Sequence, residues 1–184
     1  MSSVGQFGHD VLDFVRQHQA WAAPIVFALA FAESLAFLSF VVPAWAVLVG
    51  IGAMMKTGGI AFLPVLLAGA LGAALGDWLS YWLGHLLQDR IPRMWPFRAH
   101  PDLLKHGEAF IAKWGALAIF IGRFSGPLRA SVPIAAGMLG MPQTTFQIAN
   151  FTSALIWVAV LLELGDVGAL VWVWLSRVME RVWG

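Results

Sequence analysis

Two apolar stretches of this sequence have lengths that do not fit a single membrane span. The first covers 20–55, 36 residues in which Glu33 is the one acidic or basic side chain. The second covers 114–162, 49 residues in which Arg123 and Arg129 are the acidic or basic side chains. A straight helix as long as the first stretch would measure about 54 Å, whereas the hydrocarbon core of a bilayer is about 30 Å thick. Each stretch is therefore expected to break within the membrane.

The composition indicates an integral membrane protein. Hydrophobic residues make up 60% of the 184 residues and charged residues 11%, whereas soluble domains carry roughly 25% charged residues. The formal net charge is +1 and no basic patch is evident, so we expect no nucleic-acid partner. The chain has no cysteine, which excludes a disulfide framework, a thiolate nucleophile and a zinc–cysteine site.

Proline and glycine mark the points where the two stretches are expected to break. The expected break points are Pro43, Gly50 and Gly52 in the first stretch and Pro127, Pro133, Gly137, Gly140 and Pro142 in the second. A broken helix that faces lipid leaves unpaired peptide groups, so it persists only where protein buries it or a water-filled cavity receives it. The sequence therefore predicts an all-α integral membrane protein in which two re-entrant hairpins point toward a shared centre.

The remaining segments are expected to complete one multi-pass membrane domain over 21–184. Its first half, 21–87, holds one hairpin and one membrane span. Residues 88–113 contain five of the eleven Lys and Arg residues, which predicts a basic cytoplasmic loop by the positive-inside rule. The second half, 114–184, holds the other hairpin and a last helix. Residues 1–20 are expected to form an amphipathic helix that lies on the membrane surface.

The two apolar stretches have the same number of residues between a charged side chain and a proline. Glu33 lies ten residues before Pro43, and Arg123 lies ten residues before Pro133. Each proline is followed by small residues and glycine, a methionine and a long apolar segment. Corresponding broken segments in two halves are typical of transporters built from inverted repeats. Two unrelated membrane hairpins would give the same spacing, and this alternative stays open.

Arg123 and Arg129 are the leading candidates for a binding site. A guanidinium stays charged and presents a fork of donors that fits phosphate or carboxylate. Intramembrane arginines are costly, which makes a functional role the default hypothesis. A turn at Gly126 and Pro127 would bring both guanidinium groups to one point. Two structural alternatives stay open: each arginine pairs with an intramembrane acid and joins helices, or one arginine extends its head group to the interface.

Glu33 and Asp77 are the acidic candidates. Glu33 lies inside the first apolar stretch, where a carboxylate is either paired with an arginine or protonated. Either state is compatible with proton-coupled transport, and a purely structural ion pair is the alternative. Asp77 follows a run of glycine and alanine that predicts close helix packing. It is either a site residue or a hydrogen-bond partner of Tyr81.

The sequence offers little support for an enzyme or a metal site. The chain has no histidine pair at helical spacing, so we expect neither a metal nor another cofactor. An intramembrane aspartyl protease needs Gly-x-Gly-Asp, but Ala74 and Glu163 stand at the leading positions before Asp77 and Asp166. No Ser–His or Cys–His arrangement offers an acyl-transfer site, so no catalytic residue is predicted.

With these residues identified, the sequence resembles the DedA family of bacterial inner-membrane proteins, relatives of the eukaryotic VTT-domain scramblases. The resemblance covers most of Phe31 to Trp157. Its matching stretches are FAESLAFLSFVVP, GALGAALGDWLSYWLG, HGEAFIAKWGALAIFIGRFSGPLRASVPIAAGMLGM and FQIANFTSALIW. The third of these is the most specific, because it matches glycine, arginine, phenylalanine and proline at many fixed positions.

The resemblance implies two oppositely directed re-entrant hairpins that meet at the membrane centre and are braced by transmembrane helices. It also implies movement of lipids across the bacterial inner membrane, with undecaprenyl phosphate as the cargo of several members and phospholipids as that of others. Dependence on the proton-motive force is a theme of the family. Glu33 then matches the acid of the first hairpin, Asp77 the acid of the Gly-Asp motif, and Arg123 and Arg129 the two arginines of the second hairpin.

One departure from the family pattern concerns the first hairpin. Many members have Pro-Gly followed by an acidic or polar residue, whereas this chain has Pro43-Ala44-Trp45. The second acid of the proton-coupling pair is therefore absent, which leaves proton coupling and the choice of cargo open. Trp45 is an alternative lining residue for an acyl or prenyl chain.

We therefore expect a flippase for a phosphate-bearing lipid, foremost undecaprenyl phosphate. The expected transport residues are Glu33, Asp77, Arg123 and Arg129. The residues expected to shape the hairpins are Pro43, Gly126, Pro127, Pro133 and Gly137. The expected partners are the lipid and the surrounding membrane lipids, and a homo-oligomer stays open. A phospholipid scramblase and a membrane scaffold with a buried Glu–Arg network are the alternatives, while a channel is disfavoured because no ring of like charges is evident.

Overall fold

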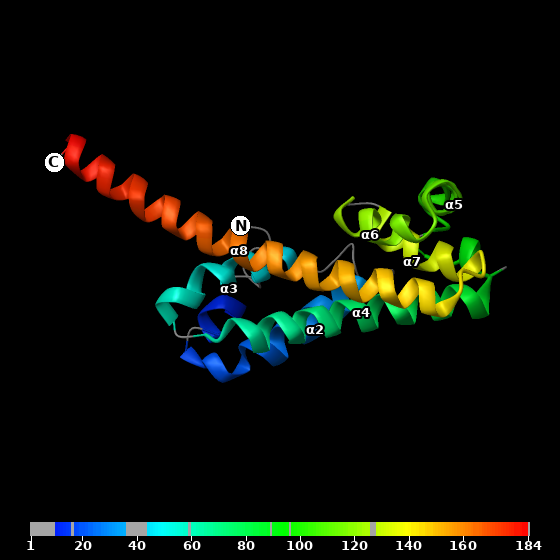
Figure 1. Cartoon of the computed structure of the whole chain (residues 1–184), viewed down its shortest axis with the longest axis horizontal. Helices are drawn as coiled ribbons and strands as arrows, with labels where there is room; N and C mark the ends of the chain where they lie inside the picture. Colours follow the sequence, from blue (N-terminus) through cyan, green and yellow to red (C-terminus); the bar gives the residue numbers. More distant parts are fainter. Residues whose placement is uncertain are drawn as a thin grey trace.

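The computed structural model describes residues 10–15, 17–35, 44–58, 60–88, 90–95, 97–125 and 128–183. This part of the chain consists of helices and short connections and contains no strand, which confirms the all-α prediction (Figure 1). The elements are η1 (Gln19–Trp21), α2 (Ala22–Ser34), α3 (Ala44–Gly58), α4 (Phe62–Leu87), η2 (Ile91–Arg93), α5 (Pro101–Trp114), α6 (Ala116–Phe124), α7 (Leu128–Met138) and α8 (Gln143–Trp183).

The first apolar stretch is interrupted between α2 and α3. Helix α2 ends at Ser34 and α3 begins at Ala44, and Pro43 lies outside the described residues. The prediction that Gly50 and Gly52 break this stretch is wrong, because both lie inside α3. Gly52 serves close packing instead: a Cβ at this position would meet the backbone carbonyl oxygen of Leu162 in α8.

The second apolar stretch is interrupted at three places. Gly115, with a positive φ of 55°, separates α5 from α6, and Gly140, with a φ of 67°, lies between α7 and α8. The third interruption follows Phe124, at the end of α6. Such φ values favour glycine because a Cβ would clash with the backbone. Gly126 and Pro127 lie outside the described residues.

The prediction that Pro133 and Gly137 break the second stretch is wrong. Both lie inside α7. A proline within a membrane helix is tolerated where neighbouring helices surround the freed backbone groups, and α7 is buried almost throughout. Gly137 lies against α4, where a Cβ would meet the carbonyl oxygen of Tyr81.

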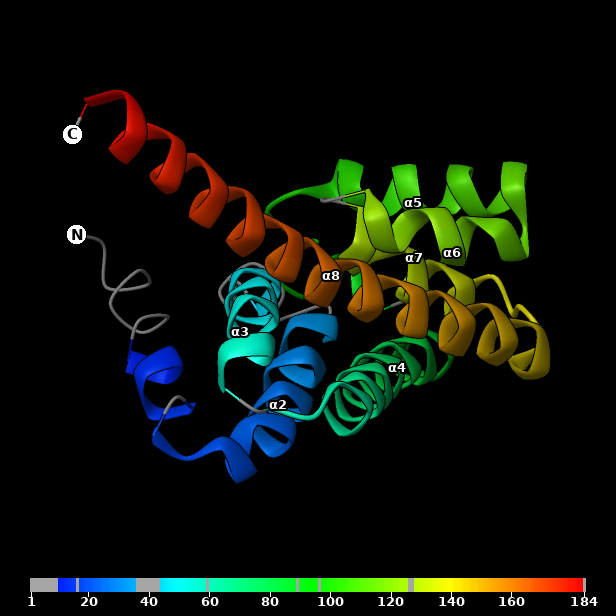
Figure 2. The same ribbon diagram turned by 60° about the vertical axis from the view of Figure 1, so that its left-hand side comes forward.

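Two of the described helices are long and apolar enough to cross a membrane. They are α4 and the first part of α8, Gln143–Gly168. Helices α4 and α8 contact each other, with α2 packed on α4 and α3 packed on α8. Helices α5, α6 and α7 gather at one end of this assembly, while the C-terminal part of α8 extends away from it (Figures 1 and 2).

Glycines allow the closest of these helix contacts, and they act in reciprocal pairs. Between α4 and α7, a Cβ at Gly84 would meet the carbonyl oxygen of Ile134, and a Cβ at Gly137 would meet that of Tyr81. Between α3 and α8, a Cβ at Gly52 would meet the carbonyl oxygen of Leu162, and a Cβ at Gly165 would meet that of Val49. The absence of a side chain lets the helix backbones approach closely.

The segment 88–113, predicted as a basic loop, is largely folded. It contains η2 and most of α5, whose Leu104 and Ile111 are buried. These side chains pack with residues of α7, so the segment is attached to the core while its Lys and Arg side chains are exposed. At the other end of the chain, the helical residues 10–15 bury Val15 beside Leu48 of α3.

Candidate functional site

The four charged residues predicted to take part in transport are all buried in the structure. The exposed fraction is 5% for Glu33, 3% for Asp77, 4% for Arg123 and 9% for Arg129. They form two ion pairs, Arg123 with Asp77 and Arg129 with Glu33. Each pair joins an acid of the first half to an arginine of the second half. Pairing with acids was one of the two structural alternatives for the arginines, and the structure shows this pairing.

The Arg123 cluster joins α4, α6 and α8. The guanidinium of Arg123 donates to Asp77 Oδ2, to Asn150 Oδ1 at 2.6 Å and to Ser153 Oγ at 3.0 Å. Asn150 in turn donates from Nδ2 to the carbonyl oxygen of Ala74 at 2.9 Å. Arg123 is therefore held by side chains from two other helices, while its Nη1 and Asp77 Oδ1 have no hydrogen-bond partner in the described part of the chain.

The Arg129 cluster joins α2, α7 and α8. The guanidinium of Arg129 donates to Glu33 Oε1 and to Ser34 Oγ, the latter at 3.1 Å. It also lies over the ring of Trp157, 4.2 Å from the ring centroid, a cation–π contact that gains strength away from water. Within the described part of the chain, Arg129 Nε has no hydrogen-bond partner.

Glu33 connects this cluster to the start of α3. Its Oε2 accepts a hydrogen bond from the backbone N–H of Trp45 at 2.9 Å. Trp45 is the second residue of α3, where backbone N–H groups lack intrahelical acceptors and the helix dipole favours negative charge. The carboxylate of Glu33 therefore lies between a guanidinium and a helix N-terminus, which are two anion-binding groups.

The structure does not join the two arginines through a shared partner, although they lie close enough to interact electrostatically. Arg123 and Arg129 hold different acids, and the residues that contact them on α8 are different. Nor does Asp77 bond to Tyr81, because the Tyr81 hydroxyl donates to the carbonyl oxygen of Met141. The alternative of a local Asp77–Tyr81 hydrogen bond is therefore wrong.

Four contact residues of these clusters were not singled out from the sequence. They are Ser34, Asn150, Ser153 and Trp157. The last three follow a spacing of three and four residues, which places them on one face of a helix. Polar residues at this spacing in an otherwise apolar span are a signal that the sequence contains. Ser34 follows Glu33 directly and carries no such pattern.

No metal centre is found among the residues that the structure describes. None of their His, Asp and Glu side chains form a group of three or more that could hold a metal ion.

Comparison with known proteins places the chain among membrane proteins. The VTT domain matches residues 42–167. Inner membrane protein YabI of Escherichia coli is 34% identical over 145 residues, which cover 78% of this chain and 57% of YabI. Inner membrane proteins YghB and YqjA of the same species are each 30% identical, over 77% of this chain and over 65% and 64% of their own lengths. The chain thus spans less than two thirds of the relatives it matches. No solved structure matches it significantly.

Proposed function

Because the chain belongs to the VTT-domain family, the DedA family of bacterial inner-membrane proteins, and carries buried arginine–carboxylate pairs between its halves, we propose that it transports a phosphate-bearing lipid. The chain is itself a protein of the inner membrane. Undecaprenyl phosphate is the first candidate cargo, since several members of the family it resembles carry this lipid. A phospholipid is the alternative cargo.

The observation that carries this proposal is the position of the Glu33 carboxylate. It occupies an anion site formed by the Arg129 guanidinium and the N-terminus of α3. Helix N-termini and guanidinium forks are the groups that proteins use to bind phosphate. Arg129 Nε has no hydrogen-bond partner in the described residues, so the guanidinium keeps a donor that neither Glu33 nor Ser34 uses. A phosphate presents three acceptor oxygens, which suit this extra donor.

In the proposed cycle, the lipid phosphate and Glu33 alternate at Arg129. Without cargo, Glu33 neutralises the buried guanidinium, whose charge would otherwise be unpaired at high cost. When the phosphate enters, Glu33 leaves the pair, and protonation of Glu33 is the step that allows proton coupling. The ends of α2 and α6 and the starts of α3 and α7 form the two re-entrant hairpins of this proposal. No covalent chemistry and no cofactor take part.

Flipping of lipids in liposomes tests the proposal. The purified protein is reconstituted with undecaprenyl phosphate, phosphatidylethanolamine or phosphatidylglycerol, and movement between leaflets is measured. We expect movement of undecaprenyl phosphate that depends on Arg129. Movement of all three lipids indicates a general scramblase, and movement of none contradicts transport.

The choice of variant matters because Arg129→Ala alone leaves Glu33 buried without its arginine, which costs about 3–5 kcal/mol. The paired variant Arg129→Met with Glu33→Gln removes both charges and is expected to fold. It should fail to move the lipid. Arg98→Ala, at an exposed position of the basic segment, serves as the matched control and should retain transport.

A second candidate function is a membrane scaffold, and the same ion pairs favour it. Both arginines have acidic partners within the chain, so both could serve only to join helices. A scaffold needs an ion pair between the helices, but it does not matter which helix carries the acid and which carries the arginine. Exchange of the two partners of a pair therefore separates the two functions.

A further inference from the structure

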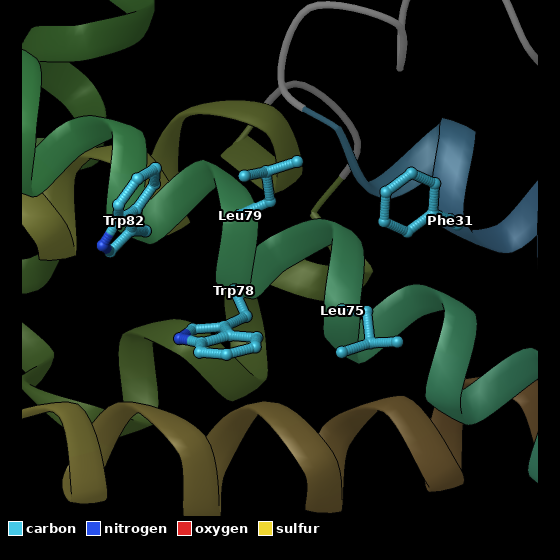
Figure 3. Close-up of a pocket in the computed structure, with 5 residues that line it drawn as sticks. All are labelled: Phe31, Leu75, Trp78, Leu79 and Trp82. Carbon is cyan, nitrogen blue, oxygen red and sulfur yellow. The ribbon is translucent and has the colours of Figure 1, made fainter.

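An apolar groove lies on the exposed face of α4. It has a volume of about 420 Å³. Five aromatic and aliphatic side chains line it (Figure 3). These are Phe31 of α2 and Leu75, Trp78, Leu79 and Trp82 of α4. The four residues of α4 follow the spacing that places side chains on one helix face. We call this hollow the α4 groove.

The chemistry of the α4 groove fits a hydrocarbon chain. No charged side chain lines it, and its only polar side-chain groups are the indole N–H groups of Trp78 and Trp82. Its volume lies within the range of about 300–1,000 Å³ that is typical of small-molecule sites. Because α4 is one of the helices long enough to cross the membrane, lipid chains are the apolar molecules that reach this face.

The α4 groove is lined by residues from the same helix turns that carry the buried charges. Phe31 and Glu33 both lie in the last part of α2, and Trp78 directly follows Asp77 in α4. Glu33 and Asp77 are buried toward the interior, whereas Trp78 is 40% exposed. The groove therefore borders the helix turns that carry Glu33 and Asp77, while the two acids themselves are buried.

A lipid is long enough to occupy both places. The hydrocarbon core of a bilayer is about 30 Å thick, so one leaflet accommodates a chain that extends about 15 Å. We propose that the α4 groove holds the hydrocarbon chain of the phosphate-bearing lipid while its phosphate replaces Glu33 at Arg129. This inference rests on the proposed function, and it assigns the tail of the cargo to a place in the molecule.

The α4 groove would orient the chain more than it would add affinity. Lipid tails around the protein are as apolar as the groove, so transfer of a chain from the bilayer gains little hydrophobic free energy. What the groove offers is packing against two rigid indole rings and one fixed direction relative to the phosphate. The inference is therefore tested by occupancy and transport rate, not by affinity alone.

The absence of cysteine in this chain makes a site-directed spin label practical. A nitroxide is attached to Leu79→Cys in the groove or, as the matched control, to Leu67→Cys, which is exposed on α4 two turns before Leu75. The labelled protein in liposomes receives undecaprenyl phosphate, undecaprenol or hexyl phosphate. We expect undecaprenyl phosphate alone to remove the mobile component of the spectrum at position 79, with no change at position 67.

The paired variant Arg129→Met with Glu33→Gln separates this inference from the proposed function. It should abolish both transport and the immobilisation of the label. Transport that depends on Arg129 while the label at 79 stays mobile overturns the groove assignment and leaves the function intact. Immobilisation by undecaprenol, or immobilisation that persists in the paired variant, shows that the groove binds bulk lipid and also overturns the assignment. If the protein that keeps Glu33 and Arg129 shows neither transport nor immobilisation of the label, the proposed function and the groove assignment are both contradicted.

Filling of the α4 groove provides a second measurement that needs no label. Leu79→Trp places an indole in the groove, and Leu67→Trp makes the same change outside it. We expect Leu79→Trp to slow the transport of undecaprenyl phosphate about tenfold, because the chain loses its packed position during passage. Equal transport rates for the two variants would overturn the inference.

Discussion

Arg123 and Arg129 differ in what their guanidinium groups contact, although both are buried and both pair with a carboxylate. Arg123 is enclosed by an acid, an amide and a hydroxyl that are fixed on α4 and α8. Arg129 has an acid and a hydroxyl from the last residues of α2 and an aromatic ring below it. This difference suits a structural role for Arg123 and an exchangeable partner for Arg129.

The structural role of Arg123 is tested by its removal. Arg123→Met leaves Asp77 buried without its positive partner, which lowers the free energy of unfolding by about 3–5 kcal/mol. The paired variant Arg123→Met with Asp77→Asn leaves no buried charge and should recover most of this loss. Thermal unfolding in detergent, followed by circular dichroism, measures both. If the single variant proves as stable as the paired one, the ion pair does not hold the helices together.

At the scale of the residue, the sequence identifies the charges of the site but not their partners. Glu33, Asp77, Arg123 and Arg129 stand out because ionised side chains are rare in membrane spans. Two acids and two arginines allow two ways of pairing, and the observed partners lie 46 and 96 residues apart in the chain. Spacing carries no information over such separations, so the pairing follows only from the packing of the helices.

At the scale of the element, glycine and proline have two meanings that the sequence alone does not separate. Gly115 and Gly140 end helices and have positive φ values. Gly52 and Gly137 lie inside helices and face the backbone of a neighbour. Both uses require the absence of a side chain, so the sequence shows glycine in either case. The predicted break points failed where a glycine serves packing.

The contact between α4 and α7 provides the prediction at this scale. A Cβ at Gly137 would collide with the carbonyl oxygen of Tyr81, so Gly137→Ala forces the two helices apart and should lower stability by about 1–3 kcal/mol. Gly168→Ala is the matched control, because a Cβ there meets nothing within 4 Å. The control should be neutral or gain up to about 1 kcal/mol from helix propensity. Equal thermal stability of the two variants would refute close packing as the reason for Gly137.

At the scale of the whole molecule, the two halves repeat one arrangement. Glu33 and Arg123 are each the penultimate residue of a helix, α2 and α6. Each of these helices is followed by a second short helix and then by a long one, α4 or α8. Both ion pairs join one half to the other. This order of elements matches the shared spacing of charge and proline in the sequence, and the ion pairs place all four buried charges between the halves.

Exchange of the partners across this boundary distinguishes a transporter from a scaffold. Glu33→Arg alone or Arg129→Glu alone places like charges together and should destabilise the fold. The double variant restores an ion pair between the halves and should fold, but its guanidinium then faces the N-terminus of α3, which repels positive charge. We expect transport of undecaprenyl phosphate to fall at least about tenfold, because phosphate binding needs both positive groups on the same anion.

The control for this exchange is the exposed pair of Lys105 with Asp102, whose partners are 3.9 Å apart on α5. Exchange of these two residues should alter neither stability nor transport, since exposed pairs contribute about 0–1 kcal/mol. A folded Glu33→Arg, Arg129→Glu protein that transports as fast as this control would mean that the buried pair acts only as a link between helices. A folded and inactive one means that Arg129 is required at its own position, where it faces the anion site at the start of α3.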